Sequence, residues 1–339
     1  MRKALSGVLL IVIVAGVSLA AWLHFRSNAG SAISTTTTTA TTAPASGPLA
    51  PLTGLPDPGG AALTRPALTV KIENTPEAMP QWGINQADVV YEEIVNGGIT
   101  RLAAVFNSQA PAKIGPVRSV RPTDTQVVWP LGGIFAFSGG APYAINSIST
   151  APVKLVDESS AGAAMFRDLS RQPPHNLYGV GPALFKFGGT PTPPPKLFSY
   201  LTSTDKVIGT KVAHFVVPFP SIYSVTWTWD AATASWDRTL FGTADITGTN
   251  VRESPKNVIV MWVNYVNGVG TMASYANLQG SGPASFFIDG KQVQGTWSRG
   301  TSPGDVLTYQ TKTGKVVKFT PGQTWVELLD SGVSLNVTP

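Results

Sequence analysis

Residues 88–107 read DVVYEEIVNGGITRLAAVFN, and this stretch predicts a β-hairpin from which the rest of the fold can be built outward. Both halves are rich in β-branched and aromatic residues, which favour strands. The Asn-Gly-Gly sequence at 96–98 supplies turn residues between them. In a tight hairpin, Arg101 lies across from Glu92 and Glu93. Because neighbouring residues of a strand face opposite sides, only one of these glutamates shares the face of Arg101.

The segments around this hairpin predict both strands and helices. Leu68–Glu73 alternates like a half-buried strand, and Ile134–Phe137 resembles a short buried strand. Helices are predicted over Ala141–Ser149 and Val156–Ser170. Seven strands are predicted in the second half: Val212–Val217, Tyr223–Trp229, Val258–Val266, Ser285–Ile288, Val306–Gln310, Val316–Phe319 and Thr324–Leu329. Hairpin turns are expected at Asp289-Gly290 and Thr313-Gly314.

The predicted fold class is α+β, with a mixed α/β first domain and a strand-rich second domain after a single N-terminal transmembrane helix. Composition divides the chain into five parts. They are residues 1–26, a transmembrane anchor or signal peptide; 27–56, a disordered Thr/Ala/Pro-rich stalk; 57–189, the mixed α/β domain; 190–198, a Pro-rich connector; and 199–339, the β-rich C-terminal domain.

The N-terminal segment predicts a membrane anchor. Ala4–Phe25 is apolar except for two serines and one histidine, and about 20 such residues span a bilayer as a helix. Arg2 and Lys3 precede it, so the positive-inside rule places the N-terminus in the cytoplasm and the rest of the chain outside. A cleaved signal peptide is the alternative, but its apolar core is usually about 7–15 residues long. We therefore expect a single-pass protein of the cell membrane with an extracytoplasmic C-terminal part.

Charge and composition exclude several classes of protein. Of 339 residues, 43% are hydrophobic and only 13% are charged, which excludes a wholly disordered chain. The net charge is +5, but part of it flanks the apolar N-terminus, and without a long Lys/Arg run we expect no nucleic-acid binding. The absence of cysteine excludes disulfides, thiolate zinc sites, a cysteine nucleophile and a lipobox. With three histidines, one of them in the predicted anchor, we expect neither a multi-histidine metal site nor a cofactor.

Ionic side chains gather on consecutive motifs of the first half. Arg118 and Arg121 lie close together in residues 114–124, IGPVRSVRPTD. Paired guanidiniums bind phosphate or carboxylate groups bidentately, so this segment predicts a site for an anionic ligand. The alternative is that these arginines pair with acidic residues inside the fold, and that Arg101 makes an ordinary cross-strand ion pair with a glutamate.

Two loops supply the remaining candidates. The Ser-Gly-Gly turn at 138–140 can present backbone amides to an anion. It also nearly matches a nucleophile elbow, with Asp157, Asp168 and His175 following in hydrolase order, but the first glycine of that motif is missing. In residues 171–178, RQPPHNLY, His175 follows two prolines and is either a proton donor, a phosphate ligand or a packed loop histidine. The predicted site has Glu93 and His175 as catalytic candidates, and Arg101, Arg118, Arg121, Asn176, Tyr178, Gly139 and Gly140 as anion ligands.

Aromatic residues are numerous in the second half. They are Tyr223, Trp227, Trp229, Trp236, Trp262, Tyr265, Tyr275, Trp297 and Trp325. The first interpretation is a sheet core with its aromatic partners. The alternative is a face on which carbohydrate rings stack.

Five motifs together resemble a known family. They are residues 73–83 (ENTPEAMPQWG), 87–92 (ADVVYE), 97–101 (GGITR), 114–121 (IGPVRSVR) and 175–178 (HNLY). This pattern resembles the YerB-like lipoproteins, or domain of unknown function 3048, and 290–297 (GKQVQGTW) and 321–325 (PGQTW) resemble the C-terminal domain of that family. The resemblance implies a bacterial envelope protein without an assigned reaction. The chain departs from the family in having no lipobox, and in having Ser138 where the family has a histidine.

A looser similarity concerns the order of Thr100-Arg101, residues 117–121 and Gly139-Gly140. It is similar to the LytR-CpsA-Psr cell-wall transferases, which have a membrane anchor, an extracytoplasmic α/β domain and arginines that hold a lipid pyrophosphate. This likeness implies an analogy of arrangement and not a reaction.

The sequence leaves three classes of function open. The first is an envelope protein that binds an anionic cell-wall polymer or an envelope partner through its first domain. The second is a hydrolase or transferase acting on an envelope glycan or a pyrophosphate-linked precursor, with arginines holding the anion and a Glu or His handling the proton. The third is a scaffold whose second domain docks to a partner protein.

Overall fold

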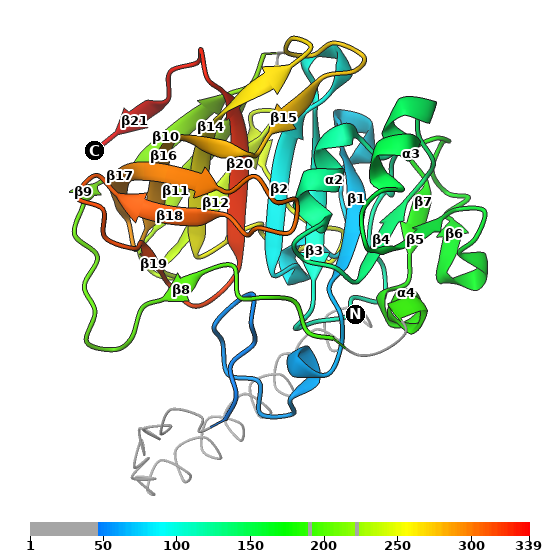
Figure 1. Cartoon of the computed structure of the whole chain (residues 1–339), viewed down its shortest axis with the longest axis horizontal. Helices are drawn as coiled ribbons and strands as arrows, with labels where there is room; N and C mark the ends of the chain where they lie inside the picture. The colour runs from blue at the N-terminus through cyan, green and yellow to red at the C-terminus, as the bar shows by residue number, and fades with distance from the viewer. Residues whose placement is uncertain (1–46, 189–191, 221–223) are drawn as a thin grey trace, which may run out of the picture. The chain divides into compact units, whose positions relative to one another are not determined.

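The computed structural model of the protein describes residues 47–188, 192–220 and 224–339. A twelve-stranded sheet joins the halves of the chain that lie before and after the Pro-rich connector (Figure 1). Its strands follow one another in the order β18 (Thr308–Thr311), β17 (Lys291–Arg299), β16 (Gly280–Ile288), β14 (Asn257–Val266), β20 (Thr324–Asp330), β2 (Val89–Ile94), β3 (Thr100–Phe106), β1 (Leu68–Asn74), β4 (Ile134–Phe137) and β5 (Lys154–Asp157). In addition, β15 (Tyr275–Asn277) pairs with β14, and β9 (Thr210–Lys211) pairs with β17.

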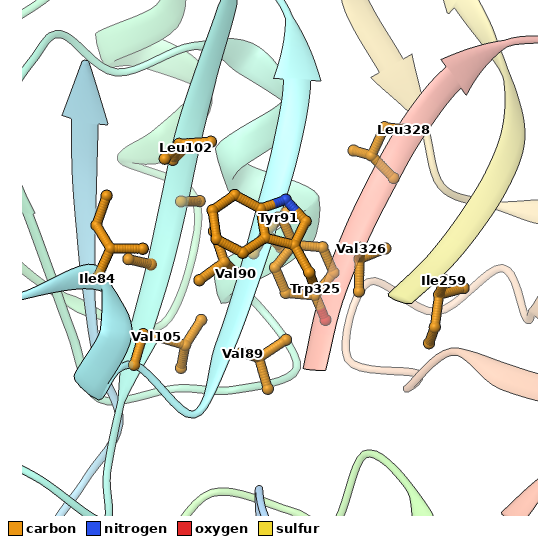
Figure 2. Packing of buried hydrophobic residues seen from close by; sticks show 14 of the residues in the cluster. Ile84, Val89, Val90, Tyr91, Leu102, Val105, Ile259, Trp325, Val326 and Leu328 are labelled. Carbon is orange, nitrogen blue, oxygen red and sulfur yellow. The ribbon is translucent and has the colours of Figure 1, made fainter. Parts of the chain in front are cut away.

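The two halves meet where β20 lies between β2 and β14. It pairs in parallel with both, so Val326 is opposite Tyr91 on one side and Ile259 on the other. Figure 2 shows this junction, with Trp325, Val326 and neighbouring apolar side chains packed across the three strands. Strands from before and after the predicted connector, residues 190–198, belong to one sheet. The two predicted domains therefore share a hydrophobic core. The division into two domains stays a prediction.

A second sheet covers one face of the large sheet. It contains β13 (Thr243–Ala244), β12 (Ser235–Leu240), β11 (Ser224–Asp230), β10 (His214–Pro218) and β21 (Asn336–Thr338). Aromatic rings fill the interface: Phe215 stacks on Phe287 at 3.5 Å, and Trp227 lies edge-on to Trp325 at 5.4 Å. These four rings are buried, as the sheet-core interpretation of the aromatic residues expects.

Helices cover the opposite face near β1, β3 and β4. They are α2 (Pro122–Val128) and α3 (Pro142–Ile148), and the first half also contains α4 (Gly181–Leu184). Val128 of α2 and Ile148 of α3 pack against Phe135 in a small apolar cluster. Two further pairs of short strands are β6 (Met165–Arg167) with β7 (Leu177–Gly179), and β8 (Ser199–Tyr200) with β19 (Lys318–Phe319).

The prediction of an α+β fold is wrong, because the described residues are mostly β. The α-helices α2, α3 and α4 are 7, 7 and 4 residues long. The helix expected over Val156–Ser170 is replaced by the end of β5, a turn and β6. The cause is local: Asp157 Oδ1 accepts a hydrogen bond from Ser160 N at 2.9 Å, and Gly162 has a φ of 53°. Side chains that bond their own backbone in this way compete with helix formation.

The predicted membrane anchor, residues 1–26, lies outside the described residues, as does most of the predicted stalk. Within the part that the structure describes, no helix is long and apolar enough to cross a membrane. Residues 47–56 were also expected to belong to the disordered stalk, and this end of the prediction is wrong. Leu49 forms a β-bridge with Pro56, and Leu52 is fully buried in the main core.

Candidate functional site

Charged side chains form a row on the helix-covered face of the large sheet. In the register of β1, β3 and β2, Glu73 lies opposite Arg101, and Arg101 lies opposite Glu93. Lys71, two residues before Glu73, faces the same side. Glu92 points to the other face, so Glu93 is the glutamate that shares the face of Arg101. We call Lys71, Glu73, Glu93, Arg101, Arg118, Arg121, Asp124 and His175 the arginine cluster.

A buried lysine connects this row to α2. Lys71 Nζ contacts Glu93 Oε1 and lies 2.8 Å from Asp124 Oδ1. Asp124 Oδ2 accepts a hydrogen bond of 2.7 Å from Arg121 N at the beginning of α2. Burial raises the pKa of Asp124 to about 6, and the charge of Lys71 opposes that rise. The ion pairs therefore fix the loop that precedes α2 over the ends of β1 and β3.

That loop brings three guanidiniums together. Arg118 Nη2 lies 2.8 Å from Glu73 Oε1. Arg101 Nη1 and Arg121 Nη1 both point to the carbonyl oxygen of Ser119, at 3.1 and 3.5 Å. Arg121 Nη2 also donates to Asn96 Oδ1 at 2.7 Å. Arg101 is only 9% exposed, whereas Arg118 and Arg121 are half-buried above it.

The positive charge of the cluster is not balanced. Among the residues that the structure describes, neither Arg101 nor Arg121 forms an ion pair with a carboxylate. The buried Nε atoms of Arg118 and Arg121 have no hydrogen-bond partner there either. Burial lowers the pKa of Arg101 to about 9, and repulsion from Arg121 and Arg118 adds to this effect. An anion placed among these guanidiniums would relieve the repulsion between them.

His175 joins the cluster through Glu73. Its Nδ1 lies 2.9 Å from Glu73 Oε2, so Glu73 contacts both His175 and Arg118. Within the described residues, no group makes a hydrogen bond to His175 Nε2. A carboxylate at Nδ1 favours the tautomer that carries its proton on that atom, which leaves Nε2 as a base.

The predicted ligands outside this group are placed differently. Gly139 O accepts a hydrogen bond of 3.0 Å from Val120 N, so the Ser-Gly-Gly turn holds the loop that carries Arg118 and Arg121. The side chain of Asn176 accepts from Arg167 Nη1 at 2.7 Å, and the hydroxyl of Tyr178 accepts from Arg171 at the same distance. These two side chains are committed to other partners. Among the described residues no hydrogen bond joins Gly140 to a guanidinium, and a Cβ added at this position would lie 2.6 Å from Val120 Cγ1.

The hydrolase order of Ser138, Asp157, Asp168 and His175 does not form a triad. His175 contacts Glu73, and Asp168 pairs with Lys113 at 2.8 Å. Sequence reasoning instead missed Lys71, Glu73 and Asp124 as members of the site. The alternation in Leu68–Glu73 placed the first two on one face of a strand, but it did not indicate that this face is buried.

A separate network of buried charges lies on the opposite face, beneath the second sheet. Arg238 Nη2 is 2.7 Å from Glu92 Oε2, and Arg238 Nη1 contacts Asp245. Glu327 accepts a hydrogen bond of 2.8 Å from Trp227 Nε1, and its pKa is raised well above the usual range by burial and by Glu92. Glu92 is therefore part of a structural network that joins β2 to the second sheet.

Glu253 gives this network a pH dependence. It is fully buried, and neither of its carboxyl oxygens has a hydrogen-bond partner among the described residues. Burial, followed by the charge of Asp245, raises its pKa well above the usual value. A carboxyl group with a raised pKa stabilises the fold below its unfolded pKa and loses that contribution as the pH rises through its folded pKa.

We expect the free energy of unfolding of the protein to fall as the pH rises above the usual glutamate range. The variant Glu253→Gln should lose part of that dependence, because an amide does not ionise. Urea unfolding at about pH 5 and about pH 8 measures the difference. Glu158→Gln, at an exposed ion pair with Arg167, is the control and should keep the wild-type dependence. An unchanged slope in Glu253→Gln would show that this group does not titrate on folding.

Comparison with known proteins places the chain in a family. Residues 52–189 match the N-terminal domain, and residues 215–326 the C-terminal domain, of "Protein of unknown function (DUF3048)". The chain belongs to this family. Both predicted domains of the resemblance are thus present, in the expected order.

A relative and a solved structure that are similar to this chain extend this result. "Putative lipoprotein YerB" of Bacillus subtilis (strain 168) is 36% identical over 131 residues, which cover 38% of this chain and 39% of that relative. The matched part of this chain therefore spans well under two thirds of the length of that relative. The crystal structure of YerB protein from Bacillus subtilis superposes with a TM-score of 0.75 at 23% identity and covers 86% of this chain and 100% of that one. This second likeness shows a shared fold.

Proposed function

We propose that this DUF3048 protein binds an anionic polymer of the bacterial envelope through Arg101, Arg118 and Arg121. The observation that carries the proposal is that three guanidiniums converge while only Arg118 has a carboxylate partner among the described residues. Buried guanidiniums whose partners are all neutral are costly, and a phosphate or carboxylate group compensates their charge in bidentate geometry. The name of the lipoprotein relative supports a membrane-associated, extracytoplasmic location.

The polymer class follows from the number of guanidiniums that converge. Guanidiniums bind both phosphate and carboxylate groups bidentately, but a phosphate group offers more acceptor oxygens to three of them than a carboxylate does. Arg118 and Arg121 are half-buried, so an elongated ligand can reach the exposed parts of both side chains from the surface, and the charge of buried Arg101 attracts it. We therefore favour a phosphate-bearing polymer over a polymer of carboxylates.

Binding of the full-length chain to fluorescently labelled polyphosphate tests this proposal. We expect saturable binding that weakens steeply with salt, competition by inorganic pyrophosphate, and much weaker binding to polygalacturonate. Arg121→Gln should lower the affinity about tenfold, the effect of one charged hydrogen bond. Arg167→Gln, at an exposed ion pair, is the control and should leave the affinity unchanged. Equal affinities of the two variants would refute the proposed site.

A second candidate function is hydrolysis or transfer on a phosphate-linked envelope precursor, and the contact between Glu73 and His175 favours it. In such a reaction His175 Nε2 accepts the proton of water or of an acceptor hydroxyl, while the arginines hold the phosphate. Glu93, the predicted catalytic glutamate, is buried against Lys71, so Glu73 is better placed to orient His175.

His175→Gln separates this candidate from simple binding. If His175 is the base, we expect the release of phosphate from polyphosphate or pyrophosphate to fall by a factor of about 100 or more. The affinity for polyphosphate should change little, because the three arginines remain. Turnover that is absent in the wild type, or unchanged in the variant, would leave binding as the function.

A further inference from the structure

A second concentration of positive charge lies at the other end of the large sheet. Here a groove of about 780 Å³ opens between the loop 201–210, which joins β8 to β9, and the segment 311–318 after β18. Residues 292–294 of β17 form part of its lining. We call this the lysine groove, because Lys206, Lys312, Lys315 and Lys318 line it.

The lysine groove carries more positive charge than its own acidic residue can balance. Lys318 pairs with Asp205 at 2.9 Å, and Lys312 Nζ donates to Gln294 Oε1 at 2.6 Å. Within the described chain, Lys206 and Lys315 form no ion pair. The whole protein has a net charge of only +5, part of which belongs to the N-terminal segment. With four lysines and Asp205, the lysine groove has a local net charge of +3, which exceeds the +2 that is left when Arg2, Lys3 and Arg26 are set aside.

The same groove exposes apolar side chains. Ile208 is 89% exposed and Val316 is 61% exposed, and both line the groove from opposite walls. Large apolar side chains that gather at a concave surface, with charges around them, are typical of a binding site for another molecule. The matching ligand carries negative charges and apolar groups together.

These features indicate a polypeptide occupant. Phosphate polymers and nucleic-acid backbones offer no apolar side chains to Ile208 and Val316. The groove has no arginine lining it, whereas the proposed phosphate site has three. A lysine ammonium group is a compact point charge on a flexible stem, and a single carboxylate can pair with it without bidentate geometry. A concave surface also fits an extended chain better than the plane of a membrane.

We propose that the lysine groove is a docking site for an acidic, extended segment of a partner protein. Its carboxylates contact Lys206 and Lys315, and its apolar side chains pack against Ile208 and Val316. This surface belongs to the C-terminal half and is independent of the arginine cluster, so either site can fail without the other.

Fluorescence anisotropy of the full-length chain with a labelled synthetic peptide tests this inference. In the peptide, glutamate and leucine alternate. We expect the double variant Lys206→Glu, Lys315→Glu to weaken binding about tenfold or more, because two attractive contacts become repulsive. Ile208→Ser should weaken it several-fold. Lys154→Glu, at an exposed lysine on β5, is the control and should bind like the wild type.

Three results would overturn the proposal. One is equal binding by the double variant and the wild type. The second is equal binding of a peptide in which serine replaces every leucine, since the apolar contacts would then be unused. The third is failure of the wild type to bind the Glu–Leu peptide. If that failure is accompanied by lysine-dependent binding to phosphatidylglycerol vesicles, the groove is assigned to a lipid surface instead.

Discussion

Replacing Arg238 with methionine is expected to lower the free energy of unfolding by about 3–5 kcal/mol. The guanidinium is fully buried, and it lies 2.7 Å from Glu92 and in contact with Asp245. It also lies 4.7 Å from the ring centre of Trp325, at the junction of the two sheets. Methionine fills much of the space but leaves two buried carboxylates without a cation. Chemical unfolding monitored by tryptophan fluorescence measures the loss.

A second variant makes the cause testable. If unpaired carboxylates cause the loss, Arg238→Met combined with Glu92→Gln should recover more than about 1 kcal/mol of it. Arg167→Met, which removes an exposed arginine from its pair with Glu158, should cost less than about 1 kcal/mol. A similar cost for Arg238→Met and Arg167→Met would show that the buried network contributes little to stability.

The double variant Arg118→Gln, Arg121→Gln is expected to lower the affinity for tripolyphosphate about 100-fold or more. Each guanidinium supplies charged hydrogen bonds worth about 1.5–3 kcal/mol, and two such losses exceed a factor of 100. Both side chains are half-buried near the surface, and the lysine that fixes their loop, Lys71, is untouched. Calorimetric titration of the wild type and the variant measures the difference.

The stability of the same variant checks that the loss concerns the ligand. Arg118 contacts Glu73, so its removal carries some cost to folding, whereas Arg121 forms no ion pair within the described residues. Urea unfolding without ligand should therefore show a modest change, and adding tripolyphosphate should stabilise the wild type but not the double variant. Equal stabilisation of both proteins would place the anion elsewhere.

The parts of the fold that depend on local signals were predictable from the sequence. The hairpin of β2 and β3 forms as expected, with Glu93 opposite Arg101. The Asp289-Gly290 turn connects β16 to β17, with positive φ at both residues. Such turns are set by neighbouring residues, so a single stretch of sequence contains the information.

Long-range pairing explains most of what the sequence could not provide. Nothing in residues 324–330 indicates that β20 inserts between β2 and β14, which makes one sheet out of two predicted domains. Arg238 was not a candidate for any role, because its partner Glu92 is 146 positions away. The prediction of a helix over Val156–Ser170 was wrong because hydrogen bonds between Asp157 and Ser160 override the helical pattern of the segment.

The candidate site was predictable in its arginines, Glu93 and His175, and not in Lys71, Glu73 and Asp124. Scarcity of charge identified Arg101, Arg118 and Arg121, and the structure brings them together. Lys71 and Glu73 looked like the exposed positions of a half-buried strand, yet both are buried. Their burial depends on the loop 118–121 and α2 folding over the sheet, which the local pattern does not contain.

Crystals of the protein soaked in selenate test directly whether Arg101, Arg118 and Arg121 form an anion site. Selenate resembles a tetrahedral phosphate group and is located by its anomalous scattering. We predict an anomalous peak that places a selenate beside Arg118 and Arg121, with its oxygens at hydrogen-bond distance, about 2.7–3.2 Å, from their guanidinium nitrogens. Crystals without such a peak, or with a peak only among the lysines of the lysine groove, would contradict the account.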